Sequence, residues 1–507
     1  MFCKVHTAGI HGIQSFPAGV EVDVSTGLPG FDLVGLLNSE VKESRERVRV
    51  ALKNSGFRLP PQRITVNISP ADIRKEGSAY DLAIALGILV SMEQLPEEIL
   101  ENTIYIGELG LNGEIKPVKG VLPMMLMAKE EGFAYCILPE ENVFEASAVD
   151  GLKIIGVSSL EHLIGILLSS DREAFIEREK QGESGNGFQE EEIYDFSEIQ
   201  GQELVKRAAV IAAAGFHHLL ILGPPGTGKT MTAKRIPSIL PPLSKEESLE
   251  VSKIYSVSGL LKKERPIITT RPFLHPHHTI SKQALAGGGR IPRPGVISLS
   301  HKGILFLDEL PEFGRENIEI LRQPLEDKEI QIARSFGSIT YPADIMMVAA
   351  MNPCPCGFYP DRNRCSCSEA EIKKYRNRIS GPIYDRMDLC VEAKQTLWEH
   401  LKEPKKQISS KELKEKVMAA RKMQEIRYEG TKYYFNSQLT AGDIDGYCKL
   451  QEEEEQYMEQ IFYSLKLSAR AYHRILKVAR TIADLEQSEK IERKHLAEAI
   501  CYRGFER

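Results

Sequence analysis

The chain has 507 residues, of which 42% are hydrophobic and 27% are charged, and its formal net charge is −6. These proportions are those of an ordinary folded protein and exclude a fibrous or wholly disordered chain. At about 150 residues per domain, the length predicts about three domains. The mild acidity argues against a polybasic coat for nucleic acid. It remains compatible with a basic loop in an acidic body, because net charge averages over the whole surface.

Cysteine usage and hydropathy indicate the compartment. The nine cysteines are an odd number and are dispersed except for one group of four, which favours a reducing compartment over a disulfide framework. The first residues lead into no apolar core of signal-peptide length, and no stretch reaches the roughly 18 apolar residues of a membrane span. We therefore expect a cytoplasmic protein that does not contact a membrane.

The first part of the chain alternates between helical and extended patterns. Apolar periodicity predicts helices over residues 36–54 and 81–92, with a strand at 64–68 between them. The dipeptide Asn112-Gly113 is typical of a two-residue β-hairpin turn. We therefore predict an α/β or α+β domain over residues 1–177.

Composition marks the later boundaries. Residues 178–193 are rich in Glu, Gly, Ser, Gln and Asn and nearly lack apolar side chains, which predicts a linker. A second domain then covers residues 194–398. From residue 399 to 507, apolar residues recur every three or four positions among charged ones, which predicts a helical domain at the end of the chain.

A phosphate-binding motif lies at the start of the second domain. The apolar run 219–222 reads as a buried strand and residues 231–236 as the start of a helix. Between them stands the motif G-x-x-x-x-G-K-T, formed by Gly223, Pro224, Pro225, Gly226, Thr227, Gly228, Lys229 and Thr230. The glycines let backbone N–H groups surround a phosphate, Lys229 neutralises phosphate oxygens, and Thr230 offers an oxygen to Mg²⁺. The motif therefore predicts a site for a magnesium nucleotide.

Two later apolar strands end in polar residues suited to the same site. The run 304–307 ends at Asp308 and Glu309; we expect Asp308 to hold Mg²⁺ and Glu309 to polarise the attacking water. The run 344–351 ends at Asn352, whose amide suits the γ-phosphate or the water. Taken alone, an Asn before a proline is more often a turn residue.

In their order along the chain, these elements resemble the Walker A, Walker B and sensor 1 motifs of AAA+ ATPases. Segments 199–202, 303–313 and 349–357 narrow the resemblance to the magnesium-chelatase-like AAA+ proteins of bacteria known as ComM or YifB, over nearly the whole chain. The resemblance implies a P-loop ATPase core on a parallel sheet, a C-terminal helical lid, ATP and Mg²⁺ as cofactors, and a homohexameric ring. In the ComM branch it implies an ATP-driven helicase or translocase that migrates branched DNA in homologous recombination or natural transformation.

The same resemblance assigns two arginines by position. Arg386 corresponds to the arginine finger, which reaches the γ-phosphate bound by a neighbouring subunit, and Arg470 to the sensor 2 arginine of the lid. Arg376 and Arg378 are rivals for the role of the finger. By residue type alone, any of them is a surface arginine in a salt bridge.

Four cysteines are grouped directly after Asn352. Two close pairs of thiolates across a short loop can meet on one tetrahedral Zn²⁺. An iron–sulfur cluster, redox disulfides and four separate buried thiols are the alternatives. We predict a structural zinc site that braces the loop carrying Asn352. Its ligands, within the loop 354–367, are Cys354, Cys356, Cys365 and Cys367.

Two basic loops are candidates for contact with DNA. They cover residues 286–295 and 328–337, and in magnesium-chelatase-like AAA+ proteins the corresponding insertions point into a central pore. The resemblance thus implies that Arg290, Arg293 and Arg334 follow the phosphate backbone of single-stranded or branched DNA. Both loops are alternatively contacts between subunits.

The first domain resembles the proteolytic domain of Lon and its inactive relatives, through segments 75–82 and 113–120. The register places Ala79 near the position of the catalytic serine and Leu122 at that of the lysine, so that Ser78, one residue away, has no base. We expect a platform without protease activity. The first alternative to a DNA motor is a chelatase-type motor that remodels a protein partner. An ATP-dependent protease is a second, less favoured alternative.

Overall fold

The computed structural model describes residues 2–59, 61–169, 172–176, 194–289, 292–334, 337–395 and 407–503. The predicted linker 178–193, Arg290, and the predicted boundary at residues 398 and 399 lie outside them, and the side chain of Arg334 is likewise not described. The chain divides into two compact units. The first consists of residues 1–188 and 245–268, and the second of residues 189–244 and 269–507.

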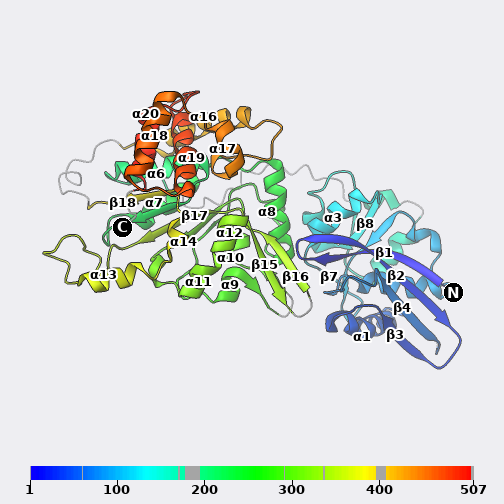
Figure 1. Ribbon diagram of the computed structural model, residues 1–507. Helices are drawn as coiled ribbons and strands as arrows, with labels where there is room; N and C mark the ends of the chain where they lie inside the picture. The colour runs from blue at the N-terminus through cyan, green and yellow to red at the C-terminus, as the bar shows by residue number, and fades with distance from the viewer. Residues whose placement is uncertain are drawn as a thin grey trace. The chain divides into compact units, whose positions relative to one another are not determined.

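The first unit is built on a seven-stranded mixed sheet with the strand order β3-β4-β2-β1-β5-β8-β9 (Figure 1). β1 and β2 form a long antiparallel pair, whereas β5, β8 and β9 follow in parallel. The strands are β1 (Phe2–His11), β2 (Gln14–Ser25), β3 (Gly30–Val34), β4 (Arg63–Ser69), β5 (Thr103–Tyr105), β8 (Tyr135–Pro139) and β9 (Lys153–Val157).

The helices of this unit follow the predicted pattern closely. α1 spans Ser39–Asn54, and its first turn is capped by Asn38, whose side chain accepts a hydrogen bond from the backbone of Val41 at 2.9 Å. α2 spans Asp81–Ser91, and all of its residues are buried, since almost every side chain in it is apolar. The remaining helices are α3 (Val121–Glu130), α4 (Val143–Ala146) and α5 (Leu160–Leu167).

The predicted hairpin at Asn112-Gly113 exists, but its loop is longer than two residues. β6 (Glu108–Leu109) pairs with β7 (Ile115–Lys116), which leaves the loop Gly110–Glu114. Gly113 has a φ of +85°. The Asn112 side chain accepts a hydrogen bond from the backbone of Glu114 at 3.2 Å. The prediction of a two-residue turn was wrong because this local side-chain bond closes a wider loop.

One helix of the first unit comes from the middle of the second domain in sequence. α8 (Lys245–Ser258) lies against α3, where the backbone N–H of Gly120 donates to the carbonyl of Ser256 at 3.1 Å. Leu249 and Ile267 pack against a core that includes Leu122. The chain therefore leaves the second unit before α8 and returns to it after Ile268.

The second unit is built on five parallel strands in the order β11-β14-β17-β10-β18. β10, β14 and β17 are buried along their whole length, as their continuous apolar sequences require. These strands are β10 (Leu219–Leu222), β11 (Phe273–Leu274), β14 (Ile304–Leu307), β17 (Met346–Met351) and β18 (Leu389–Glu392). With the C-terminal helices, they confirm the predicted fold class of an α/β first domain, a P-loop core and a helical end.

Short helices and two hairpins surround this sheet. The hairpins pair β12 with β13 and β15 with β16, both antiparallel. Their strands are β12 (Gly287–Gly288), β13 (Arg293–Pro294), β15 (Glu329–Arg334) and β16 (Gly337–Pro342). The helices are α6 (Glu203–Gly215), α7 (Lys229–Ile239), α9 (Lys282–Ala286), α10 (Val296–Leu299), α11 (Arg315–Ile320), α12 (Arg322–Asp327), α13 (Glu369–Arg376) and α14 (Gly381–Tyr384).

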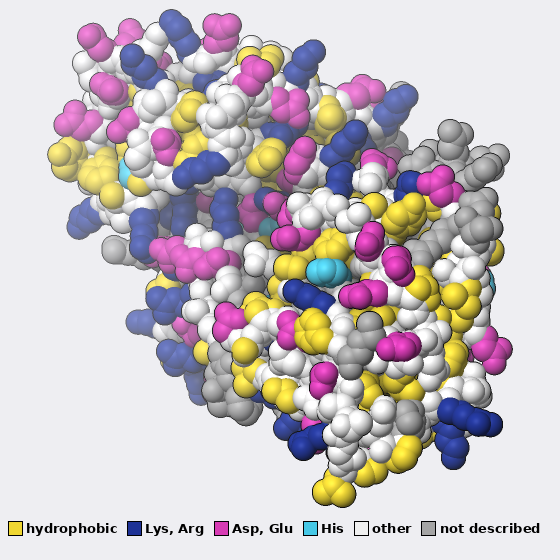
Figure 2. Space-filling model, turned by 90° about the vertical axis from the view of Figure 1, so that its right-hand side faces the viewer, with side chains coloured by type: hydrophobic (Ala, Val, Ile, Leu, Met, Phe, Trp, Pro, Cys, Tyr) yellow, Lys and Arg dark blue, Asp and Glu magenta, His cyan; other side chains and the backbone are white. Residues whose placement is uncertain are grey.

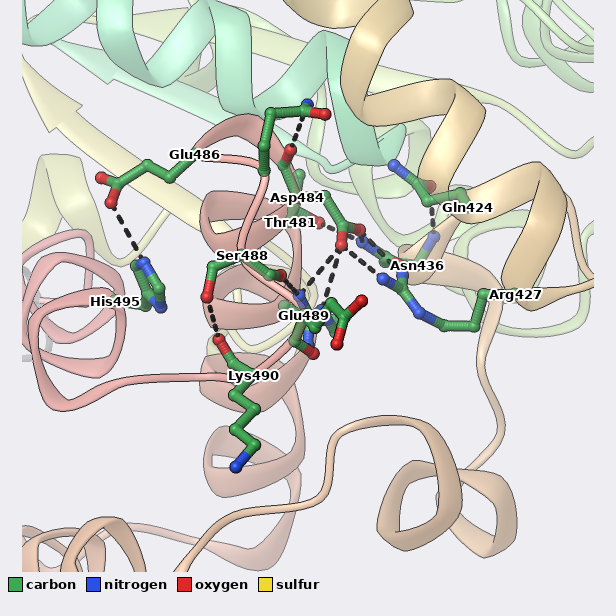
Figure 3. A network of polar contacts seen from close by, with 12 residues as sticks. Gln424, Arg427, Asn436, Thr481, Asp484, Glu486, Ser488, Glu489, Lys490 and His495 are labelled. Atoms are coloured by element: carbon green, nitrogen blue, oxygen red, sulfur yellow. Dashed lines mark hydrogen bonds and ion pairs between the residues drawn. The ribbon is translucent and has the colours of Figure 1, made fainter.

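A buried polar network holds the C-terminal helices together (Figure 3). Asp484 is fully buried and accepts hydrogen bonds from Arg427 at 2.9 Å and Asn436 at 2.8 Å. Thr481 shares a 2.8 Å hydrogen bond with His217, which lies just before β10, so the network fixes α19 to the base of the five-stranded sheet. The helices are α16 (Ser410–Arg427), α17 (Ala441–Tyr447), α18 (Glu452–Ser464), α19 (Ala469–Leu485) and α20 (Arg493–Cys501).

The surface carries charges of both signs. On the face drawn in Figure 2, basic and acidic side chains lie interspersed with apolar ones, and neither sign covers the whole face. Although the net charge of the chain is −6, the acidic side chains on this face do not form a single continuous patch. Among the described helices, none combines the length and apolar composition needed to cross a bilayer.

Candidate nucleotide-binding site and cysteine cluster

The phosphate loop joins the central strand β10 to the first turn of α7. Gly228, directly before α7, has a φ of +84°, which a residue with a Cβ rarely adopts. At Gly223 the constraint is space, because a Cβ there would lie 2.4 Å from the carbonyl oxygen of Ala393. The loop therefore takes the conformation in which N–H groups at the start of a helix can face an anion.

The ammonium group of Lys229 lies inside this loop. Its Nζ donates to the carbonyl oxygens of Gly223 at 2.8 Å and Pro224 at 2.9 Å, and a third bond of 3.1 Å reaches Oδ1 of Asn352. Burial lowers the pKa of Lys229, while the nearby carboxylates of Asp308 and Glu309 act to raise it. The structure thus brings the Walker A lysine and the predicted sensor 1 amide into direct contact.

The predicted magnesium ligands also meet. Oγ1 of Thr230 donates to Oδ2 of Asp308 at 2.7 Å. Asp308 follows β14, and β17, which ends before Asn352, lies between β14 and β10. A hydroxyl and a carboxylate oxygen are the hard ligands that Mg²⁺ prefers, so this pair fits the ion.

The candidate catalytic glutamate is exposed beside this pair. Glu309 has a φ of +52°, and its backbone N–H donates to Oδ1 of Asp308 at 3.0 Å. Nδ1 of His278 lies 3.9 Å from the carboxylate of Glu309. None of the sequence motifs includes His278.

A cavity of about 440 Å³ adjoins the phosphate loop. It is lined on one side by Gly226, Thr227 and Thr230 and on the other by Ile199, Gln200 and Gln202. The second group belongs to the segment ahead of the phosphate loop that carried part of the family resemblance. That segment and the phosphate loop thus line the same cavity.

The predicted arginine finger and the predicted sensor 2 arginine bind the same carboxylate. Arg386 is only 7% exposed and donates through Nη1 to the carbonyl of Pro382 at 2.7 Å. Its Nη2 donates to Glu326, and so does Nη2 of Arg470, at 3.3 Å. Within the described part of the chain, neither arginine makes a recorded hydrogen bond or ion pair with the phosphate loop. Sequence reasoning missed Glu326, because no motif includes it.

The rival arginines lie in a different place. Arg376 donates to the carbonyl of Pro353 at 3.2 Å and lies over the ring of Tyr359. Arg378 is half exposed and pairs with Glu312 at 2.7 Å. Arg376 is thus bound near the cysteine loop, and Arg378 is bound near the end of the Walker B segment. Among the contacts of the described residues, neither arginine binds Glu326.

The four predicted thiol ligands converge. Their sulfur atoms all lie within 4.8 Å of one another, and three of the four residues are buried. The three recorded Sγ···Sγ contacts are 3.4, 3.6 and 3.8 Å. A tetrahedral Zn²⁺ with Zn–S bonds of about 2.3 Å needs sulfur atoms about 3.8 Å apart. The donor set and its spacing therefore fit zinc.

This cysteine loop touches the phosphate loop. A Cβ at Gly357 would lie 2.7 Å from Cδ of Pro225 and 3.8 Å from Cγ of Asn352. Gly357 stands one residue after Cys356, so the cluster, the sensor amide and the phosphate loop are in contact. A change in the conformation of the cysteine loop would therefore reach the phosphate loop through this contact.

Comparison with protein families places these elements together. Three family models match: "Magnesium chelatase, subunit ChlI" over residues 195–401, "Subunit ChlI of Mg-chelatase" over 20–142, and "Magnesium chelatase, subunit ChlI C-terminal" over 407–503. YifB of Escherichia coli and the competence protein ComM of Haemophilus influenzae are each 42% identical over 99% of this chain and 97% of their own length. The chain belongs to the ComM/YifB family of magnesium-chelatase-like AAA+ proteins.

Membership in the ComM/YifB family makes the chain an AAA+ motor protein. The family implies ATP hydrolysis with ATP and Mg²⁺, and AAA+ proteins of this type assemble into oligomers. Lon protease 2 of Bacillus subtilis is 32% identical over 26% of this chain and 23% of its own length. This local similarity agrees with the Lon-like α/β fold.

In the Lon-like region of this ComM/YifB protein, the residues at the positions assigned to the Lon serine and lysine are buried. Leu122 is fully buried and its backbone N–H donates to Oε1 of Glu145 at 2.8 Å. Ala79 is buried, and Ser78 donates its hydroxyl to the carboxylate of Glu108. No lysine contacts Ser78 among the hydrogen bonds recorded for the described residues.

The two basic loops lie side by side in this family member. The Tyr341 hydroxyl in β16 donates to the carbonyl of Pro292 at 2.8 Å. Ile332 in β15 reaches Gly287 in β12, where an added Cβ would lie 2.7 Å from its Cδ1. Arg293 in β13 is exposed. The hairpins β12–β13 and β15–β16 are thus one surface, and Arg293 is the predicted DNA contact whose side chain the structure describes.

Proposed function

We propose that this chain is an ATP-driven, ring-shaped DNA translocase or branch-migration helicase that acts in homologous recombination or natural transformation. The observation that carries the proposal is the contact of Lys229 with Asn352 and of Thr230 with Asp308, which brings together the groups that one chain offers to a magnesium nucleotide. The name of the competence protein ComM, 42% identical over the whole chain, supports a role with DNA. We place the protein in the cytoplasm, where thiolate ligands stay reduced.

The chemistry of hydrolysis follows from the positions of the side chains. Lys229 holds the β- and γ-phosphates, whose oxygens compete with the loop carbonyls for its three N–H donors. Thr230 and Asp308 would hold Mg²⁺, which would neutralise charge on the phosphates. Glu309 orients and polarises the attacking water, and Asn352 hydrogen-bonds the γ-phosphate or that water.

We propose that each nucleotide site is completed by a second copy of the chain. Arg386 and Arg470 lie together on Glu326 and not on the phosphate loop of their own chain. A guanidinium that stabilises the transition state must touch the γ-phosphate. Both arginines therefore act on the nucleotide of a neighbour, in a homohexameric ring.

The domains have separate tasks in this proposal. Residues 1–177 form a platform without protease activity, residues 194–398 the motor, and residues 399–507 the lid, with 178–193 as a linker. Cys354, Cys356, Cys365 and Cys367 hold a structural Zn²⁺ that supports the loop carrying Asn352. Because four thiolates fill a tetrahedral shell, the metal takes no part in the chemical step.

DNA contact is assigned to the paired hairpins. Arg293, with Arg290 and Arg334, binds the phosphate backbone of single-stranded or branched DNA in the centre of the ring. Six copies of each arginine concentrate positive charge there, although each chain has a net charge of −6. The tie between Tyr341 and Pro292 keeps the two hairpins together as they contact the strand.

The test is the ATPase rate of the purified protein with and without single-stranded DNA and a four-way junction. We expect DNA to raise the rate, and Arg293→Ala to weaken DNA binding and to lower the salt dependence of binding. Lys490→Ala, which removes an exposed lysine of the C-terminal region, is the matched control.

Absence of both stimulation and binding at low salt would contradict the DNA proposal. If ATP is still hydrolysed under those conditions, the result supports the alternative of a chelatase-type motor that remodels a protein partner. Loss of DNA binding in Lys490→Ala to the same degree as in Arg293→Ala would remove the hairpins from the proposal.

A further inference from the structure

Glu326 is the meeting point of two arginines that stand far from it in sequence. Its Oε2 accepts from Nη2 of Arg386, 60 positions later, and its Oε1 accepts from Nη2 of Arg470 at 3.3 Å, 144 positions later. Glu326 lies in the last turn of α12 and is about half exposed. One carboxylate thus holds the predicted arginine finger and the predicted sensor 2 arginine within their own chain.

This contact competes with the role proposed for Arg386. Both terminal nitrogens of its guanidinium are used inside the chain, Nη1 by the carbonyl of Pro382 and Nη2 by Glu326. A carboxylate and a phosphate both offer two anionic oxygens to the two terminal nitrogens of a guanidinium. Arg386 therefore has to leave Glu326 before it can bind the γ-phosphate of a neighbouring subunit.

Glu326 is also next to the base of the hairpin β15–β16. Lys328, two residues later, has a φ of +59° and starts the turn into β15. Its carbonyl accepts from the backbone of Ala343, the first residue after β16, at 2.7 Å. Its ammonium lies 3.6 Å from Asp344, which also binds Lys302 at 2.9 Å. A shift of the hairpin therefore moves the end of α12 that carries Glu326.

From these contacts we infer that Glu326 is a positioning residue that couples the hairpin β15–β16 to the two arginines. It retains Arg386 and Arg470 while the hairpin is at rest, and it releases them to the neighbouring nucleotide when the hairpin is displaced by the translocated strand. The inference rests on the proposed function, because it takes Arg386 and Arg470 as groups that act on a second subunit.

The test is a comparison of ATPase rates for Glu326→Gln and the unaltered protein, with and without single-stranded DNA. Gln keeps the shape of the side chain but removes the charge that holds the arginines. We expect the rate without DNA to rise by up to about fivefold, which is the range for the loss of a partly exposed ion pair. The ratio of the stimulated to the unstimulated rate should fall towards one.

Asp327→Asn is the matched control. Asp327 is the next residue of the same helix, is exposed and has no ion pair recorded among the described residues. The variant Asp327→Asn undergoes the same change of charge, and we expect its ATPase rates with and without DNA to equal those of the unaltered protein. In a background of Arg386→Ala, Glu326→Gln should no longer change the rate, because its effect passes through that guanidinium.

Two outcomes would overturn the inference. Unchanged rates in Glu326→Gln would show that the carboxylate does not restrain the arginines. A parallel fall of both rates would show that it only supports the fold. If Arg386→Ala itself hydrolyses ATP at the normal rate, the assignment of the finger fails instead. An inactive Arg386→Ala together with a silent Glu326→Gln would leave that assignment intact and refute the coupling alone.

Discussion

The nucleotide site of the second unit and the Lon-like segments of the first unit differ in the chemical character of their side chains. In the second unit, Lys229, Thr230, Asp308 and Asn352 converge through direct hydrogen bonds. In the first unit, Leu122, at the position that the resemblance assigns to the Lon lysine, is fully buried. Polar and charged side chains thus converge in the second unit, whereas an apolar side chain is described at this Lon-like position. Fold alone is therefore no guide to activity, which depends on the side chains of the site.

The largest effect is expected at the nucleotide site. Glu309→Gln should bind ATP but lower turnover by at least about 100-fold, because the amide cannot polarise water as the carboxylate does. Nucleotide binding by fluorescence and phosphate release measure the two properties separately. Glu316→Gln, an exposed glutamate in α11 that pairs with Lys282 at 3.7 Å, should be unaffected. Normal turnover in Glu309→Gln would remove that residue from the mechanism.

A second prediction extends the nucleotide site to the cysteine loop. Cys365→Ser should reduce the zinc content from about one ion per chain to near zero, since three thiolates bind the metal far more weakly than four. Because Gly357 contacts Pro225, the same variant should bind ATP several-fold more weakly. Cys501→Ser, which changes an exposed cysteine outside the cluster, is the control. Purified wild-type protein without metal would contradict the zinc site.

A third prediction concerns the buried carboxyl group of Glu145 in the Lon-like region. Burial raises the pKa of Glu145 above its ordinary value of 4.5. The protonated carboxyl therefore favours the folded state below pH 4.5, and this contribution is lost as the pH rises through the raised pKa. Glu145→Gln should remove that pH dependence of unfolding in denaturant, whereas the exposed Glu141→Gln should preserve it. An unchanged pH profile in Glu145→Gln would show that Glu145 does not titrate with folding.

The smallest effect is expected at Ser78. Ser78→Ala should leave the ATPase rate unchanged and alter stability by no more than about 1 kcal/mol, because it removes one partly buried hydrogen bond. Neither the variant nor the unaltered chain should degrade casein. If the unaltered chain degrades casein and Ser78→Ala does not, the result would support the protease alternative. It would also contradict the difference drawn between the Lon-like region and the nucleotide site.

Much of the nucleotide site was predictable because its signals are local. The run Leu219–Leu222, the glycines after it and the start of α7 are adjacent in sequence, and β14 and β17 end in polar residues where the sheet places ligands. The cysteine cluster was predictable for the same reason, since its two pairs lie within one loop. The helices α1 and α2 and the strand β4 also appear close to their expected ends.

The parts that sequence reasoning missed depend on contacts between distant residues. Glu326 binds arginines 60 and 144 positions away, and nothing in its neighbouring sequence indicates this. α8 follows the ATPase helix α7 along the chain but packs on α3 of the first unit. The wider loop Gly110–Glu114 was missed because a side-chain bond from Asn112 replaced the expected tight turn.

The central claim is that an ATPase site forms between two copies of the chain. The most direct measurement mixes two variants, Lys229→Ala, which cannot bind phosphate, and Arg386→Ala, which lacks the finger. Each should be nearly inactive alone. In an equal mixture, random assembly pairs an intact loop with an intact finger at about a quarter of the interfaces. We expect ATP hydrolysis to recover to roughly that fraction of the normal rate. Mixed rings that stay as inactive as either variant alone would contradict it.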